Sequence, residues 1–330
     1  MPGTPIGPHT RFDLASLTKP IATTTLLAQE VAAGRIALHG TVADYLPDAT
    51  GTAAAPLTVG DLLAHCSGWP AWHDFFAQTN TIADRVGQAA LIRRLVLATQ
   101  PVAPPRQCAV YSDLGFMTLG WILETVCGAP LDQLLALRVA RPLGIAIGFR
   151  RLSQAHLPQS IVATEIWPPR CPDGRPLQGQ VHDDNCAGLD GVAGHAGMFG
   201  SAHDVALWAQ QWLNASRGTT GALALDPALG HHWTATGSVA GSSWRHGWDS
   251  PTQPGSTAGS LAPLDTFGHL GFTGTSVWCS SQHAVAVVLL TNRVHPSRAA
   301  VAPIKALRVD VHDLLWQAIV GGAPKNLRAR

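Results

Sequence analysis

The serine and the lysine at positions 16 and 19 have the types and the spacing that nucleophilic catalysis requires. Residues three apart on a helix share a face, so the ammonium of Lys19 can reach the hydroxyl of Ser16. A serine hydroxyl is a poor nucleophile until a neighbouring group takes its proton, and a partly buried lysine can do so or support a base. The S-x-x-K pattern also arises by chance in helices, so its interpretation depends on the rest of the chain.

A tyrosine and a histidine later in the chain have side chains suited to the same site. Tyr111 follows a proline-rich loop and precedes a helical pattern. A phenol beside an ammonium has a lowered pKa and can act as a general base. His269 stands on a predicted strand two residues before Gly271, where a basic side chain can hold part of a substrate and the glycine lets substrate backbone approach. An ordinary half-buried tyrosine and a hydrogen-bonded strand histidine are the alternatives.

Taken together, these motifs resemble the β-lactamase/penicillin-binding-protein superfamily of active-site serine enzymes, which carries S-x-x-K and K-T-G signatures. The second motif is similar to the Y-x-N of the branch that contains class C enzymes, D,D-peptidases and family VIII carboxylesterases. Residues 58–68, T-V-G-D-L-L-A-H-C-S-G, and the glycine-rich residues 194–201 also resemble segments of that branch. The resemblance implies a β-lactamase/transpeptidase-like α/β (α+β) fold, with an antiparallel sheet flanked by helices and a mostly helical region.

The resemblance also implies a role for each matching residue. Ser16 is expected to be the acylated nucleophile, Lys19 its proton partner, and Tyr111 the general base that activates the serine and later the deacylating water. The backbone N–H groups of Ser16 and Phe272 are expected to form the oxyanion hole. No metal and no organic cofactor is implied.

Two side chains depart from the family pattern. Asp113 stands where many relatives have Asn, so an acceptor replaces the amide that donates to a lactam side chain. His269 stands where they have Lys, which weakens the fixed positive charge that would hold a β-lactam carboxylate. Asp113, His269 and Gly271 are the expected substrate-binding residues. The two departures favour ester cleavage over β-lactam hydrolysis.

Composition excludes several other functions. The 330 residues carry a formal net charge of +1 and show no basic stripe or acidic tail, so neither nucleic acid nor a membrane surface is an expected partner. The six cysteines form no C-x-x-C pair, which favours free thiols in a reducing compartment. No charged-then-apolar leader follows Met1. The expectation is a cytoplasmic protein, and its oligomeric state stays open.

Other polar and aromatic groups have less distinctive interpretations. Residues 182–184 (His-Asp-Asp) and His195 match no zinc spacing, and a hydrogen-bonded loop network is the preferred interpretation. Trp69, Trp72 and Trp167 lie in segments that are expected to flank the cleft, although core packing is the alternative for each.

The elements that position these residues are predicted from periodicity and end signals. A helix from Ser16 to about Gly34 holds Pro20 in its first turn. A helix over residues 58–66 has Thr58 as its N-cap, with Asp61 at the capping-box position. Residues 141–200 are expected to be long loops, and His231 and His232 a solvated loop pair. The remaining predicted elements are helices over residues 83–99, 113–127, 130–140, 201–213 (opened by a Ser201–Asp204 capping box) and 299–320, and strands over 267–271, 275–279 and 284–290.

These elements predict an α/β region formed by residues 1–57 and 230–330, and a mostly helical region with long loops over residues 58–229. Only fifteen residues precede Ser16, whereas relatives carry a helix and two strands there. Those strands of the family are therefore expected to be missing. The strand over 284–290 would then be a bare edge unless something else covers it.

The resulting hypothesis is a serine hydrolase that acts through a Ser16 acyl-enzyme, as a carboxylesterase on small esters. A β-lactamase or a D-amino-acid/D,D-peptidase is the alternative within enzymes, so the substrate is a small-molecule ester, lactam or peptide. A catalytically inactive ligand-binding homologue and a truncated product are the alternatives outside them.

Overall fold

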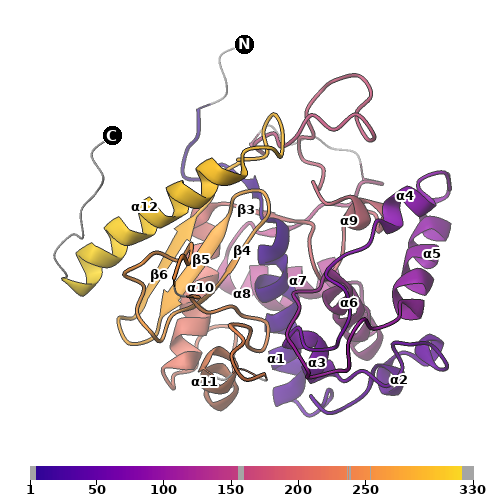
Figure 1. Cartoon of the computed structure of the whole chain (residues 1–330), viewed down its shortest axis with the longest axis horizontal. Coiled ribbons are helices and arrows are strands. Elements are labelled where there is room, and N and C mark those ends of the chain that lie inside the picture. Colours follow the sequence, from indigo (N-terminus) through magenta and orange to yellow (C-terminus); the bar gives the residue numbers. More distant parts are fainter. Residues whose placement is uncertain (1–4, 155–159, 236, 238, 253, 322–330) are drawn as a thin grey trace.

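An antiparallel sheet of order β4-β5-β6 carries the third predicted motif (Figure 1). Side chains alternate across β5 (Ser276–Ser280), so that Val277 belongs to the main core while Trp278 belongs to a smaller cluster with Trp316. Helix α10 (Ala202–Ser216) packs against β5 and β6, and α12 (Val301–Val320), which carries Trp316, lies across the other face. This sheet is therefore an interior layer between helices.

A second, smaller antiparallel sheet of order β1-β3-β2 anchors the segment that precedes Ser16. Strand β1 (Phe12–Asp13) pairs with β3 (Met198–Gly200), and the amide of Leu14 continues the contact by donating to the carbonyl of Met198 at 2.9 Å. The serine thus follows directly from a fixed strand.

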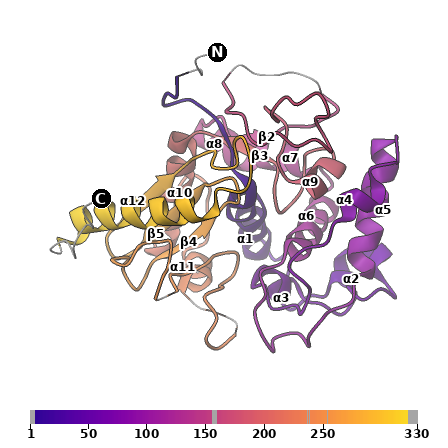
Figure 2. The same ribbon diagram turned by 45° about the horizontal axis from the view of Figure 1, so that its top comes forward.

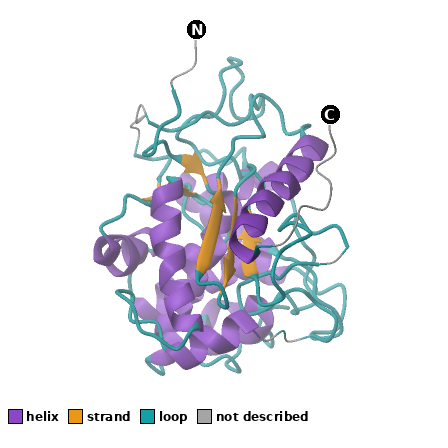
Figure 3. Cartoon of the chain, turned by 90° about the vertical axis from the view of Figure 1, so that its left-hand side faces the viewer, coloured by secondary structure: helices purple, strands orange, loops and turns teal. Residues whose placement is uncertain are grey.

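The chain places its helices on two sides of α1. Figure 2 shows α2 to α6 on one side and the β4-β5-β6 sheet with α10, α11 and α12 on the other, and Figure 3 shows how short the strands are beside the helices and loops. The remaining strands are β2 (Gly148–Phe149), β4 (Phe267–Leu270) and β6 (Val285–Leu289). The remaining helices are α1 (Thr25–Ala32), α2 (Val42–Tyr45), α3 (Val59–Leu63), α4 (Phe75–Thr79), α5 (Arg85–Ala98), α6 (Asp113–Cys127), α7 (Leu131–Leu135), α8 (Arg141–Leu143), α9 (Asp184–Gly188) and α11 (Pro227–Ala235), with the 3₁₀ helices η1 (Ala15–Leu17) and η3 (Pro47–Ala49) and the π-helical turns η2 (Lys19–Thr24) and η4 (Ala136–Ala140).

The structure, a computed structural model, describes residues 5–154, 160–235, 237, 239–252 and 254–321. The predicted α/β (α+β) class is confirmed, because antiparallel sheets are flanked by helices beside a mostly helical region. The predicted strands agree with β4, β5 and β6 to within a residue or so at each end.

The helix predicted from Ser16 to Gly34 is not a single α-helix. A 3₁₀ turn over Ala15–Leu17 passes into the π-helical turn Lys19–Thr24, and regular α-helix begins only at Thr25. Pro20 has no N–H to give to the carbonyl four residues earlier, which is that of Ser16, so an α-helical bond cannot form there. The proline limits the helix as expected, but by changing its winding.

The predicted caps are confirmed in different degrees. Ser201 and Asp204 form a complete capping box on α10. Thr58 caps α3 by accepting from the amide of Asp61 at 3.2 Å, but the Asp61 carboxylate takes the Thr58 hydroxyl and the Arg106 guanidinium instead of closing the box. Asp61 therefore ties α3 to the loop that leads to Tyr111.

Residues 141–200 and the histidine pair differ from prediction. The segment holds the short elements α8, β2, α9 and β3 between its loops, and His231 and His232 lie on α11. The four short elements have only two to five residues each, which is less than two turns of helix and too short for periodicity to reveal.

The boundary between the two predicted regions stays a prediction, although α10, which was assigned to the helical region, packs on the sheet. Strand β6 is the edge of its sheet, with no strand on its outer side in the described part of the chain, as expected for a bare edge. Within these residues no single helix is long and apolar enough to cross a membrane. One pair of helical segments, α6 followed by residues 131–143, reaches that length and apolar composition when the two are taken together, and the chain bends by 77° between them.

Glu30 joins α1 to the turn η4 through a buried carboxylate, which yields the first prediction. Its oxygens accept from Arg35 at 2.6 Å and from Arg138 at 2.5 Å, and these guanidinium groups lower the pKa of Glu30 to about 2. Replacing it by Gln leaves the arginines without their anion, and Glu30→Gln should lower the free energy of unfolding by about 2–4 kcal/mol at pH 7.

Because the folded-state pKa lies below the ordinary value of 4.5, this stabilisation is complete above pH 4.5 and is lost as the pH falls toward 2. Urea unfolding of wild type and variant between pH 7 and pH 3 measures this, and the difference between them should shrink on acidification. Asp173→Asn, which removes the exposed Arg175 pair, is the control with almost no effect. Equal effects of the two substitutions would contradict the prediction.

Candidate active site

The backbone around Ser16 is held by Asp13 in a conformation that alanine seldom adopts. One carboxylate oxygen of Asp13 accepts from the amide of Ala15 at 2.8 Å, and the other accepts from the amide of His182 at 2.7 Å. Ala15 has a φ of 47°, in the left-handed region. Such strain persists only where the surroundings impose it, and it is common at reactive groups.

Lys19 is fully buried and lies among four acceptors. Its Nζ is 3.1 Å from the Ser16 Oγ, 2.5 Å from the Tyr111 hydroxyl and 2.6 Å from an Asp113 oxygen. The carbonyl of His195 is the fourth acceptor, at 3.2 Å. Burial lowers the pKa of Lys19, while the Asp113 carboxylate opposes this shift. The structure thus brings Ser16, Lys19 and Tyr111 together as predicted, while their roles stay predictions.

Tyr111 and Asp113 reach the lysine from the start of α6. The hydroxyl of Tyr111 donates to the Ser16 Oγ at 2.7 Å, and the amide of Ser112 between them donates to the ring of His65 at 3.0 Å. The pKa of Tyr111 is raised well above its ordinary value, first by burial and then by the Asp113 carboxylate. The expectation of a lowered pKa is therefore wrong, because burial and this anion outweigh the ammonium.

Asp113 was predicted to contact substrate, and the structure shows that it also contacts the lysine. One of its oxygens forms the ion pair with Lys19, and its side chain is 14% exposed toward the cavity. The Ser16 hydroxyl is therefore connected to a carboxylate through two intervening groups, Tyr111 and Lys19.

His269 lies on β4 and carries no charge at neutral pH. The ring is buried, its Nδ1 is 2.8 Å from the carbonyl of Leu270, and burial lowers its pKa to about 3, with a further contribution from Lys19. Its position agrees with the third motif, but the basic function expected there is absent because a protonated ring would be both desolvated and close to an ammonium.

Two of the residues that line the cavity have backbone amides without an acceptor. The N–H groups of Ser16 and Phe272 donate to no acceptor in the described part of the chain. The turn that holds Phe272 is fastened to the serine segment, since the hydroxyl of Thr273 donates to the carbonyl of Asp13 at 2.7 Å and that of Thr275 to Leu14 at 3.1 Å. This arrangement fits a site for a developing oxyanion.

A cavity of about 710 Å³ opens over these groups, between the helical side of the molecule and α12. Trp72 and Trp244 contribute aromatic walls, whereas Trp69 is buried in the core and Trp167 packs under Arg298 outside the lining. The expected flanking role is therefore correct for Trp72 alone. Further lining residues that sequence reasoning did not single out for the site are Asp249, Leu270, Arg293, Arg298, Val301, Ile304, Lys305 and Arg308.

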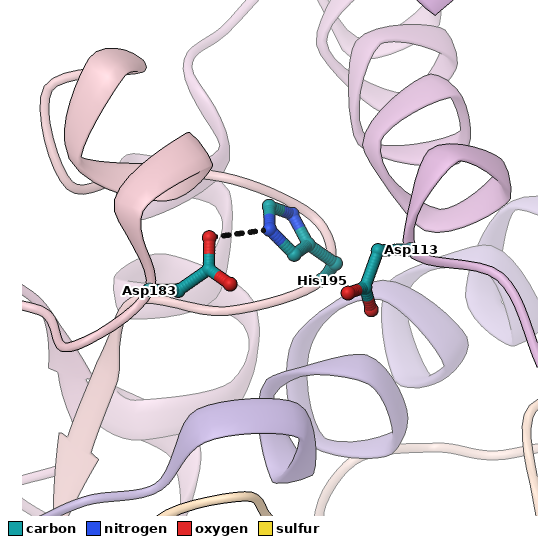
Figure 4. A group of neighbouring side chains, drawn as sticks. All are labelled: Asp113, Asp183 and His195. Atoms are coloured by element: carbon teal, nitrogen blue, oxygen red, sulfur yellow. Dashed lines mark hydrogen bonds and ion pairs between the residues drawn. The ribbon is translucent and has the colours of Figure 1, made fainter. Parts of the chain in front are cut away.

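Asp113, Asp183 and His195 form a cluster of possible metal ligands (Figure 4). Lys19 contacts two of these residues, through the Asp113 carboxylate and the His195 carbonyl. His195 contacts Asp183 at 3.0 Å through Nε2, and Asp183 caps α9 by accepting from the amide of Cys186. One ligand atom from each of the three lies within 4.8 Å of the others, which is a possible metal geometry. A metal ion there would repel the ammonium that already occupies Asp113, so the donor set fits the predicted hydrogen-bond network better.

The loop that carries His195 approaches α6 closely. A Cβ on Gly194 would lie 2.0 Å from the carbonyl oxygen of Phe116 and 3.1 Å from the Cα of Gly120. Only glycine allows the loop to reach this depth, and the carbonyl of His195 meets Lys19 as a result.

Comparison with known proteins decides the family. The family model described as Beta-lactamase matches residues 1–310. The chain belongs to the Beta-lactamase family. It is therefore a serine hydrolase enzyme, and the alternative of a protein that only binds ligands is not supported.

Curated relatives of this Beta-lactamase family member include putative D-alanyl-D-alanine carboxypeptidases. That of Salmonella gallinarum is 32% identical over 309 residues, covering 87% of this chain and 70% of the relative. That of Escherichia coli K12 is 32% identical over 314 residues, with the same coverage of 87% and 70%.

Solved structures confirm the predicted β-lactamase/transpeptidase-like fold. EstCE1, a hydrolase with promiscuous acyltransferase activity, superimposes with a TM-score of 0.69 at 22% identity, covering 92% of this chain and 86% of that one. An octameric penicillin-binding protein homologue from Pyrococcus abyssi gives a TM-score of 0.71 at 18% identity, covering 98% and 68%.

The contacts of Asp113 lead to a prediction for the pH profile. Its carboxylate raises the pKa of Tyr111 and also raises that of Lys19, so Asp113→Asn should lower both. The deprotonated forms that accept the serine proton then become available at lower pH, and the rising basic limb of kcat/KM should move to lower pH.

Ester hydrolysis between pH 5 and pH 10 measures the limb. Asp132→Asn, which alters the Arg151 pair on α7 outside the cavity, is the control that should leave the limb in place. A limb that stays in place or rises in Asp113→Asn would show that the carboxylate does not set the protonation of the site.

Proposed function

We propose that this chain is a carboxylesterase that hydrolyses small esters through an acyl-enzyme on Ser16. The observation that supports it best is the neutral, buried His269 at the position where a fixed cation would hold a substrate carboxylate. A small ester has no such carboxylate and needs only an apolar wall, which Trp72 and Trp244 supply.

Acylation in this proposal begins when the Ser16 Oγ attacks the ester carbonyl carbon. The reactive form of the site has lost one proton, with Lys19 as the neutral amine. The serine proton then passes to the Tyr111 oxygen while Tyr111 passes its own to Lys19. Lys19 becomes an ammonium, and the Asp113 carboxylate pairs with that charge without taking a proton. The contacts of 2.5–2.7 Å between neighbours along this chain support the relay.

The tetrahedral intermediate then collapses as the bond from carbonyl carbon to alcohol oxygen breaks, and the proton returns along the same chain to the leaving oxygen. Water repeats the sequence on the acyl-enzyme and releases the acid. In each intermediate the negative oxygen is placed against the free amides of Ser16 and Phe272, where preorganised donors stabilise the charge.

A D,D-carboxypeptidase is the second candidate, because the curated relatives of 32% identity carry that name and because the cavity wall holds Arg293 and Lys305. Neither Arg293 nor Lys305 forms an ion pair with a carboxylate in the described residues. A substrate carboxylate would then bind on the α12 side of the cavity rather than at His269.

Replacement of Ser16 tests the nucleophile. Ser16→Ala should abolish covalent labelling by a fluorophosphonate probe, whereas Ser67→Ala, which changes a buried serine outside the cavity, should label like wild type. Tyr111→Phe should lower kcat for ester hydrolysis by roughly 10²–10⁴-fold with an unchanged thermal melt. Peptide mapping of the labelled protein identifies the residue, and a label elsewhere than Ser16 would refute the assignment.

A substrate panel tests the ester preference. Steady-state kcat/KM for a p-nitrophenyl ester of a short acid should exceed that for a chromogenic cephalosporin and for a D-Ala-D-Ala peptide by at least about tenfold, because only the latter two need carboxylate recognition. A higher value for the peptide, reduced by Lys305→Met, would establish the second candidate instead.

A further inference from the structure

The carbonyl of Gly271 and the carbonyl of Phe272 each accept a hydrogen bond from an arginine. The Nη2 of Arg308 donates to the carbonyl of Gly271 at 2.9 Å and to that of Thr275 at 2.7 Å. The Nε of Arg293 donates to the carbonyl of Phe272 itself at 2.8 Å, and its guanidinium lies 4.3 Å from the centre of the Phe272 ring.

Arg308 is an unusual group to find behind a turn. It is 7% exposed, and in the described part of the chain it pairs with no carboxylate. Burial and the neighbouring Arg293 lower its pKa to about 10, so it is still a cation at neutral pH. Burying an unpaired guanidinium has a high desolvation cost.

Closing the turn does not require this cation. The amide of Gly274 donates to the carbonyl of Gly271 at 3.1 Å, and the amide of Gly271 donates to that of Thr275 at 2.7 Å. The turn therefore has its own backbone hydrogen bonds, and the buried charge calls for another explanation.

The peptide group between Gly271 and Phe272 explains why a cation is buried here. Its carbonyl accepts from Arg308, and its N–H is the amide of the lining residue Phe272, which has no acceptor in the described residues. In a planar trans peptide these groups point in opposite directions, so a cation that fixes the carbonyl also fixes the direction of the N–H. A charge-assisted bond to the carbonyl also polarises the amide and strengthens the N–H as a donor.

We propose that Arg308 is a positioning residue of the oxyanion hole: from behind the Gly271–Phe272 peptide it aims and polarises the Phe272 N–H toward the developing oxyanion. Arg293 assists by fixing the next carbonyl along the chain. The inference rests on the proposed function, since it requires the Phe272 amide to act as the second donor.

The test compares an ester with its thionoester analogue, in which sulfur replaces the carbonyl oxygen. Sulfur is a weak acceptor, so a donor in the oxyanion hole contributes little to the thionoester reaction. Arg308→Met should lower kcat/KM for p-nitrophenyl acetate by about 10–100-fold, with KM within about twofold, and that for p-nitrophenyl thionoacetate by less than about threefold.

Arg308→Lys, which keeps a cation able to reach the carbonyls, should recover most of the ester rate. His312→Leu is the matched structural control, because it removes a buried polar anchor one turn later on the same face of α12, where His312 contacts Thr257 and Ser276. This variant should lower the melting temperature without changing the ratio of ester to thionoester rates.

The outcomes distinguish a failure of the role of Arg308 from a failure of the proposed function. If Arg308→Met lowers the ester and thionoester rates equally, Arg308 merely supports the fold and the inference is wrong while the proposed function stands. If wild type turns over no ester but is labelled by a fluorophosphonate, the labelling rate replaces turnover and should fall about tenfold or more in Arg308→Met. If Ser16 is neither acylated nor labelled, the proposed function fails first and the oxyanion role fails with it.

Discussion

The buried ammonium of Lys19 is the group on which the rest of the site depends. A charge with no access to water is tolerated only when its protons all find acceptors, and here the acceptors come from segments far apart in the sequence. Ser16 lies on η1, Tyr111 and Asp113 at the start of α6, and His195 on the loop before β3. The same contacts that satisfy the lysine therefore bring the serine hydroxyl, the phenol and the carboxylate together around it.

One cation at the centre also determines the charge state of its neighbours. His65 and His269 both have pKa values lowered by burial and by Lys19, so both rings are neutral where they approach Tyr111 and Trp244. Desolvation and a like charge act in the same direction on each ring. As a result the rings next to Lys19 and Tyr111 are uncharged, and the cationic side chains Arg293 and Lys305 line another part of the cavity.

The sequence was enough to predict the motif residues and the outline of the fold, for reasons that are local. Ser16 and Lys19 are three residues apart, and residues 284–290 are a run of small and apolar residues rich in valine, so spacing and pattern carry the information. The predicted lowering of the Tyr111 pKa was wrong, because the shift depends on burial and on the Asp113 anion, which only tertiary structure reveals. Arg308 and Trp244 were not predicted to belong to the site. No local pattern marks them, because their roles depend on contacts with segments that are distant in the sequence.

Gly194 shows how backbone approach alone limits the ways in which this site can vary. Its missing side chain lets a loop lie against the carbonyl of Phe116 on α6, the helix whose first residue is Asp113. A single added methyl group would push the helix and the loop apart, and would separate two of the acceptors of Lys19 without touching any reactive atom. Variation is therefore constrained unevenly: the contacts of the aromatic walls Trp72 and Trp244 can be supplied by other apolar side chains, whereas Gly194, which has no chemistry of its own, has no replacement that keeps this close approach.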